Sequence, residues 1–183
     1  MKRMLSPFIE MINDETLRTK VYVALDKVPE YFWTAPASSS GKYHPPYDLG
    51  IGGTIRHTVM MIRVALDLLR MENENILAPS VNAVIVACIF HDSFKHGIPD
   101  SGHTVHEHPL LAADFVYEEF KDYDMVFADI VSGSIRSHMG RWTTSTHSNA
   151  ILPIPENEFD KLIALADYIA SRKYTQYVPE GSL

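Results

Sequence analysis

A histidine and an aspartate stand next to each other in the segment FHDSFKHG, residues 90–97, where the apolar run VNAVIVACIF ends. Imidazole nitrogens and carboxylate oxygens are ligands for divalent metals, so His91 and Asp92 are candidate metal ligands. A helix that simply reaches the surface also places polar residues side by side, and for a single pair this simpler interpretation is favoured. The pair therefore indicates a metal site only if the rest of the chain supplies further ligands.

Asp167 is the strongest of these further ligands because its surroundings in the sequence, FDKLIALADYIASRK, are largely apolar. Helical spacing places it beside Ile163, Ala164 and Ala170, on or next to a buried face. An isolated ionised carboxylate is unfavourable there, so Asp167 needs a metal, another cation or dedicated hydrogen-bond donors. A salt bridge to Arg or Lys, or a helix cap, is the alternative that involves no metal.

Three histidines add imidazole groups elsewhere in the chain: His57 in GGTIRHT, His108 in HEHP and His138 in IRSHMG. His57 shares a helical stripe with Met61, so it lies on a largely apolar face. A lone histidine in such a place is usually a hydrogen-bonded core residue. The occurrence of all three with two aspartates and the histidine next to Asp92 favours a sulfur-free site for manganese, iron, nickel, cobalt or zinc.

Helices must position these side chains, because helical periodicity dominates the sequence and period-2 alternation is scarce. The expected helices cover residues 8–28, 54–71, 80–92, 108–121, 124–138 and 157–174. Residues 29–53 are rich in Pro, Gly and Ser and predict a long loop without regular structure. We therefore expect an all-α helical bundle in which ligands from different helices converge.

Composition limits the partners and the compartment. A chain of 183 residues that is 46% hydrophobic is long enough for one well-buried domain, which we expect to span residues 1–183. A formal charge of -7 opposes charge-driven binding to extended nucleic acid or to a membrane surface, but not to a small anion in a local pocket. The one cysteine, Cys88, excludes a disulfide framework and a thiolate zinc site. No signal peptide or membrane-spanning stretch is recognised, so a cytoplasmic protein is expected.

The ordered histidines and aspartates, from GGTIRHT through FHDSFKHG to ALADYIAS, resemble the HD-domain superfamily of metal-dependent phosphohydrolases over about residues 43–173. The resemblance implies a single compact HD-domain bundle with the helix 8–28 packed on it. It also implies a first metal held by His57, His91, Asp92 and Asp167. Members with two further histidines commonly hold a second metal, and His108 and His138 match those positions. Asp92 would then bridge two divalent ions.

The implied reaction is hydrolysis of a phosphomonoester or phosphodiester bond in a nucleotide or short oligonucleotide by a metal-activated water. Asp92 and Lys95 would act in catalysis. Lys95 matches a lysine often found after the doublet and could also bind a phosphate oxygen, although a solvated lysine at a helix end is equally compatible with the sequence. Arg141 could grip phosphate and Trp142 could stack on a base, while ordinary packing is the simpler interpretation of Trp142.

A narrower resemblance concerns KYHPPYDLGIGGTIRHT and SHMGRW, which are similar to segments of the HD domains of YhaM-type 3'-5' exoribonucleases. Met139 stands where that group carries a second histidine, and no oligonucleotide-binding domain is attached, so a short substrate is expected. HEHP is similar to part of the HD-GYP signature, but the tyrosine and proline of that signature are missing. Cyclic dinucleotide hydrolysis is therefore not the first choice.

Two alternatives remain open. His103 and His106 are expected to face solvent, yet either could replace His108 if the helical register differs; His44, His96 and His147 are given no role. The alternative function is a non-catalytic HD module that binds a metal or a nucleotide and signals to a partner. Oligomeric state is not indicated by the sequence.

Overall fold

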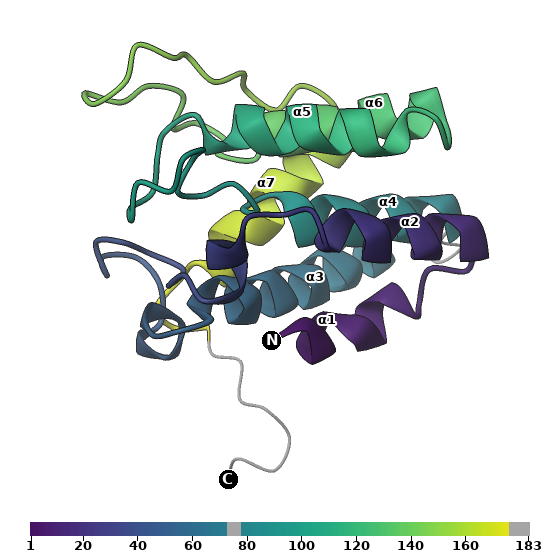
Figure 1. Ribbon diagram of the computed structural model, residues 1–183, viewed down its shortest axis with the longest axis horizontal. Coiled ribbons are helices and arrows are strands. Elements are labelled where there is room, and N and C mark those ends of the chain that lie inside the picture. Colours follow the sequence, from purple (N-terminus) through teal and green to yellow (C-terminus); the bar gives the residue numbers. More distant parts are fainter. Residues whose placement is uncertain (73–77, 176–183) are drawn as a thin grey trace, which may run out of the picture.

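The computed structural model describes residues 1–72 and 78–175 and consists of helices (Figure 1). The α-helices are α1 (Lys2–Ile9), α2 (Glu15–Leu25), α3 (Gly53–Glu72), α4 (Ala78–Phe90), α5 (His108–Phe120), α6 (Met125–Arg136) and α7 (Glu158–Ala170), with 3-10 helices η1 (Glu30–Trp33) and η2 (Pro46–Leu49). Within these ranges there is no β-strand, and the only β-bridge joins Ser145 to Ser148. The predicted all-α class is confirmed.

The N-terminal helix differs from the prediction of one helix over residues 8–28, which is wrong. Helix α1 ends at Ile9, and α2 begins after Asp14. The Asp14 carboxylate accepts a hydrogen bond from the Leu17 backbone N–H at 2.8 Å, which caps α2 and satisfies a donor that a continuous helix would use internally. Apolar spacing continues across this break, so periodicity alone did not reveal it.

The other five predicted helices correspond to α3 to α7, with shifts at their ends. The important difference is at α4, which ends at Phe90, so that His91 and Asp92 lie in the turn that follows rather than inside the helix. Residues 29–53 include η1 and η2, so the prediction that this segment lacks regular structure is wrong in part. None of the helices in the described ranges is long and apolar enough to cross a membrane.

Helix α4 lies at the centre of the bundle, and its residues 83–90 are all buried. It contacts α3 on one side and α6 on the other, and α7 contacts all three of these helices. Figure 1 shows α5 and α6 along one side of the molecule, α1 and α3 along the other, and α7 crossing near one end of α4. The end of α4 therefore lies where three other helices can bring side chains to it.

Candidate metal centre

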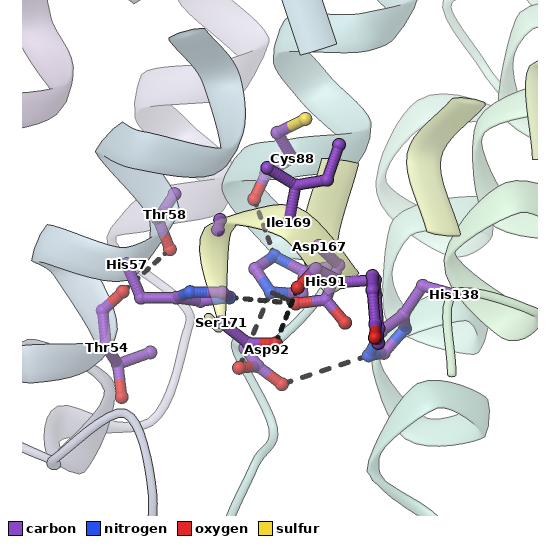
Figure 2. Close-up of polar contacts among 12 residues, drawn as sticks. Thr54, His57, Thr58, Cys88, His91, Asp92, His138, Asp167, Ile169 and Ser171 are labelled. Atoms are coloured by element: carbon purple, nitrogen blue, oxygen red, sulfur yellow. Dashed lines mark hydrogen bonds and ion pairs between the residues drawn. The ribbon is translucent and has the colours of Figure 1, made fainter. Parts of the chain in front are cut away.

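Six predicted ligands meet at the end of α4. Figure 2 labels five of them, all except His108. His57 comes from α3 and Asp167 from α7. His91 and Asp92 lie in the turn after α4, His108 is the first residue of α5, and His138 lies just after α6. The Asp167 side chain is 20% exposed, whereas the other five are buried. The sequence therefore identified a set of polar side chains that the fold brings together.

On the α3 side of this cluster, His57 and His91 lie close to the carboxylates of Asp167 and Asp92. His57 Nε2 lies 2.9 Å from Asp167 Oδ1, and His91 Nε2 lies 3.9 Å from the same oxygen. His91 Nε2 is also 3.4 Å from Asp92 Oδ2. His57, His91 and Asp92 each offer a ligand atom, and these atoms lie within 4.8 Å of one another, close enough to hold one metal ion.

The second carboxylate oxygen of Asp92 faces a different pair of histidines. Asp92 Oδ1 lies 3.1 Å from His108 Nε2 and 3.9 Å from His138 Nε2. These three residues form a second group whose ligand atoms lie within 4.8 Å of one another. Because Asp92 belongs to both groups and turns one oxygen to each, its carboxylate is placed as a bridging ligand would be.

Backbone carbonyls fix the tautomers of three of the histidines. The Nδ1 atoms of His91, His108 and His138 lie 2.7–2.8 Å from the carbonyl oxygens of Cys88, Val105 and Ile135, respectively. A carbonyl only accepts, so each Nδ1 carries a proton, and in the neutral ring Nε2 then has a free lone pair. Such a hydrogen bond is what commonly orients a metal-binding imidazole. When these rings are neutral, their Nε2 lone pairs are available to a cation beside Asp92.

The contact between His108 and His138 tests whether these residues fit a metal. Their Nε2 atoms lie 3.3 Å apart, and each ring already donates its Nδ1 proton to a carbonyl. Burial, with the charges of His91 and His108, lowers the pKa of His138 to about 3, so this ring is neutral near pH 7. Because the neutral His138 ring turns its Nε2 lone pair toward His108 Nε2, a proton or a cation must lie between the two nitrogens, and a shared metal ion meets that need.

Both carboxylates are held in their ionised form. Burial opposes the ionisation of Asp92, but the charges of Lys95 and His91 hold the pKa of this carboxyl well below its usual value. Burial also opposes the ionisation of Asp167, yet the hydrogen bond from His57 lowers its pKa. The charges of Asp92 and Asp167 in turn raise the pKa of His91 against the effect of burial. Ionised carboxylates are the form that binds metal.

Lys95 is buried and forms an ion pair with Asp92 Oδ2, one turn of chain away. The interpretation of Lys95 as a solvated lysine is therefore wrong. Its ammonium group lines a cavity of about 480 Å³ whose wall also includes Asp92, His108, His138 and Asp167. This volume is within the range of small-molecule sites. A phosphate bound there would meet a fixed positive charge beside the cluster.

An aromatic wall continues the cavity away from the metal ligands. Trp142 and Tyr168 line the cavity and stack with their ring centroids 5.7 Å apart and an interplanar angle of 20°. The Arg172 guanidinium lies 4.1 Å from the Tyr168 ring centroid and 5.7 Å from that of Tyr43, and both residues also line the cavity. Arg141 is exposed and lies 5.0 Å over Trp142 without lining the cavity itself.

Tyr43, Tyr168 and Arg172 were not identified from the sequence. Tyr168 is adjacent to Asp167, and Arg172 lies just after the end of α7, so their nearness to a ligand was a usable signal. Tyr43 lies in the irregular segment before η2, where periodicity gives no orientation.

Among the remaining histidines, His103 and His147 are exposed, whereas His96 and His106 contact other residues of the fold. His103 is exposed, as expected, but His106 is half-buried, lines the cavity and has Nε2 3.3 Å from the Thr143 carbonyl oxygen, so its expected exposure to solvent is wrong. Neither replaces His108, which is the one that reaches Asp92. His96 stacks on Tyr31 and lies 3.0 Å from Asp100. His147 is exposed.

His44 is a cavity residue that the sequence did not identify. It is buried, and its ring lies edge-on to His57 with the centroids 4.7 Å apart. Burial and the nearby charge of His57 lower the pKa of His44 to about 2, which makes a neutral ring at ordinary pH. Its position in a Pro-rich segment concealed its burial, which depends on how that segment is anchored.

Arg56 anchors this segment to α3. Its Nε and Nη2 donate to the Tyr47 carbonyl at 2.9 and 2.6 Å, and Nη1 donates to the Ile51 carbonyl at 2.8 Å. The first residue of α3, Gly53, lies so close to the same segment that a Cβ there would be 1.8 Å from the Asp48 carbonyl oxygen. Only glycine permits this approach, which sets the segment of His44 against the helix of His57.

A sequence model of the HD domain matches residues 54–172, which is more than half of the chain. Comparisons with curated proteins and with solved structures find no match. The matched range contains all six converging residues, while the organisation of residues 1–183 as one domain and the closer likeness to YhaM-type exoribonucleases stay predictions. The chain therefore belongs to the HD-domain family, a superfamily of metal-dependent phosphohydrolases.

Proposed function

We propose that this protein is a metal-dependent phosphohydrolase that cleaves a phosphomonoester or phosphodiester bond of a nucleotide or short oligonucleotide. The observation that carries the proposal is the carboxylate of Asp92, which turns one oxygen to each of two groups of metal-binding side chains. A buried carboxylate in a purely structural role needs one cation or a few donors, and Lys95 alone already supplies a charge. The surplus of imidazole lone pairs around Asp92 supports a metal site instead.

Two divalent ions are proposed, of manganese, iron, nickel, cobalt or zinc. His57, His91, Asp92 and Asp167 would hold the first, and Asp92, His108 and His138 would hold the second. When bound, such ions lower the pKa of a water molecule and neutralise negative charge on phosphate oxygens. His57 Nε2 now donates to Asp167 Oδ1, so binding of the first ion would release this proton, as metal binding to histidine generally does.

Lys95 is proposed to bind a phosphate oxygen of the substrate. It is buried, its charge is fixed by the chain beside Asp92, and it lines the cavity. A point charge in a site shielded from water stabilises the negative charge that develops during phosphoryl transfer more strongly than a solvated lysine can. Removal of the charge should therefore slow turnover more than it changes metal binding.

A nucleotide is proposed as the substrate because the cavity joins a cationic interior to an aromatic wall. Trp142 and Tyr168 provide ring surfaces, and Arg172 and Arg141 lie against those rings. Bases stack on aromatic side chains with little dependence on sequence. The formal charge of -7 opposes the binding of an extended nucleic acid, so a short substrate is favoured. A cytoplasmic location stays the prediction made from the sequence.

The experiment is a turnover screen on protein stripped of metal with a chelator and reloaded with each candidate ion. Substrates are p-nitrophenyl phosphate, its bis ester, mononucleotides and dinucleotides, with wild type compared with Asp92→Asn. Asp67→Asn is the matched control, because Asp67 is an exposed carboxylate paired with the exposed Arg70. We expect metal-dependent turnover that Asp92→Asn abolishes and Asp67→Asn preserves. Bound metal with no turnover of any substrate would instead favour the non-catalytic module.

A further inference from the structure

The imidazole of His44 has no hydrogen-bond partner among the described residues, although its residue is only 9% exposed. The Nδ1 atom is fully buried and has no hydrogen-bond partner. The Nε2 atom also has no partner, but it is not fully buried. The ring lines the same cavity as Asp92 and Lys95. A buried polar group without a partner is uncommon in native proteins and calls for a ligand or another specific reason.

Each neighbouring histidine has a partner for one ring nitrogen, although Nδ1 of His57 and Nε2 of His91 are also buried without one. His57 bonds to Asp167, and three others bond to backbone carbonyls at Nδ1 while their Nε2 atoms face the cluster: His91, His108 and His138. His44 belongs to neither group of metal-binding side chains. It therefore lies beside the cluster without being placed as one of its ligands.

The segment that carries His44 is held in place. Pro45 and Pro46 follow directly, η2 begins at Pro46, and Arg56 donates hydrogen bonds to two carbonyls of the segment. The Ala37 backbone N–H also donates to the Asp48 carbonyl at 2.9 Å. Because the backbone is fixed from both sides, the ring is oriented toward the cavity before any ligand arrives, which favours binding.

The tautomer of His44 follows from its two nitrogens. An enclosed N–H without an acceptor is rarer in proteins than an enclosed acceptor without a donor, so the proton belongs on Nε2 and the lone pair on the enclosed Nδ1. His44 then offers the cavity one N–H donor. In a cavity that also holds the Lys95 ammonium group, the matching ligand atom is an anionic oxygen.

We propose that His44 is a substrate-binding residue whose Nε2–H donates a hydrogen bond to a phosphate oxygen of the substrate. This inference rests on the proposed phosphohydrolase function and adds a second phosphate donor to Lys95. His44 contributes through contact with the substrate and leaves metal binding to the six clustered residues. Its loss should therefore weaken phosphate binding without changing the amount of bound metal.

The test compares His44→Phe, which keeps a planar ring but removes the donor, with His44→Gln, whose amide N–H reaches about as far as Nε2. Calorimetry measures the affinity of the metal-loaded protein for orthophosphate, and elemental analysis measures its metal content. We expect His44→Phe to weaken orthophosphate binding about 10- to 100-fold, as loss of a hydrogen bond to a charged group does, and His44→Gln to restore part of it. His147→Phe, at an exposed histidine, should bind as wild type does.

Two results would overturn the inference: unchanged orthophosphate affinity in His44→Phe, or loss of metal from it. A thermal unfolding curve for each variant separates loss of folding from loss of binding, and partial recovery in His44→Gln requires a folded site. Orthophosphate binding needs no turnover, so the inference can fail while wild type hydrolyses its substrates. Conversely, weakened binding in His44→Phe would support the contact even if wild type turned over no substrate.

Discussion

Asp92 Oδ1 lies 3.1 Å from His108 Nε2, although the two residues come from different helix ends and are separated by a long turn. The other oxygen of the carboxylate faces His91. Asp92 is therefore the residue that the two groups of metal-binding side chains share. His108 and His138 belong to one of these groups only, and His57 belongs only to the other.

Metal content should follow this division. Wild type should bind about two ions per chain, as binuclear hydrolases do. His138→Ala should lose about one of them, because it removes a ligand from one group only, and Asp92→Ala should lose most of both. Elemental analysis after dialysis measures this directly. Equal metal content in His138→Ala and wild type would show that the second group does not hold an ion.

Stability of the metal-free protein should fall as the pH falls from 6.5 toward 3. In this window the unfolded chain protonates His138, whereas burial keeps the folded ring neutral down to about pH 3, so protons favour the unfolded state. The raised pKa of His91 acts in the opposite direction, since its contribution is present at low pH and is lost as pH rises through its folded pKa. Urea unfolding at several pH values should therefore show that the free energy of unfolding falls less steeply from pH 6.5 to 3 in His138→Gln than in wild type.

That comparison needs a control at a histidine whose environment does not change on folding. His147→Gln serves, because His147 is exposed. Its pH profile should match that of wild type. If His138→Gln and wild type lose stability in parallel between pH 6.5 and 3, the neutral buried ring of His138 is not the cause.

Gly53→Ala should destabilise the protein by about 1–3 kcal/mol or more, because the added Cβ would lie 1.8 Å from the Asp48 carbonyl oxygen. Gly133→Ala is the matched control. Gly133 lies inside α6 with open space around the position of a Cβ, so alanine there should stabilise by roughly 0.5–1 kcal/mol through helix propensity. Chemical denaturation measures both. A Gly53→Ala variant at least as stable as wild type would contradict the close approach at Gly53.

Trp142 should report on nucleotide binding. The chain has two tryptophans, of which Trp33 is 7% exposed and Trp142 is 44% exposed and lines the cavity. In Trp33→Phe, the remaining fluorescence belongs to Trp142. A mononucleotide added to metal-free protein should change its intensity, whereas ribose 5-phosphate should not, because only the nucleotide carries a base that can reach the aromatic wall. Identical responses to both ligands would argue against stacking.

The sequence predicted much of the cluster because its residues combine two signals. His57 and Asp167 are polar groups on apolar helical faces, and the adjacent pair ends the most apolar run in the chain. The resemblance to HD domains then ordered these residues as ligands. Such signals depend on local sequence and helical geometry, which is why α3 to α7 and all six residues were found together.

What the sequence did not predict depends on tertiary contacts. The burial of His44 follows from the way Arg56 and Gly53 hold an irregular segment against α3, and no local pattern encodes this. The break between α1 and α2 depends on the cap by Asp14, while apolar spacing runs through it. The burial of Lys95 likewise follows from the turn after α4 rather than from a helical face.

We propose that one carboxylate, that of Asp92, is shared by two metal ions. Anomalous diffraction from crystals of the manganese-loaded protein tests it most directly, because it locates each ion independently of activity. We expect two anomalous peaks about 3.5–4 Å apart, the usual spacing of two-metal sites, with one oxygen of Asp92 directed to each. A single peak, or two peaks of which only one contacts Asp92, would contradict it.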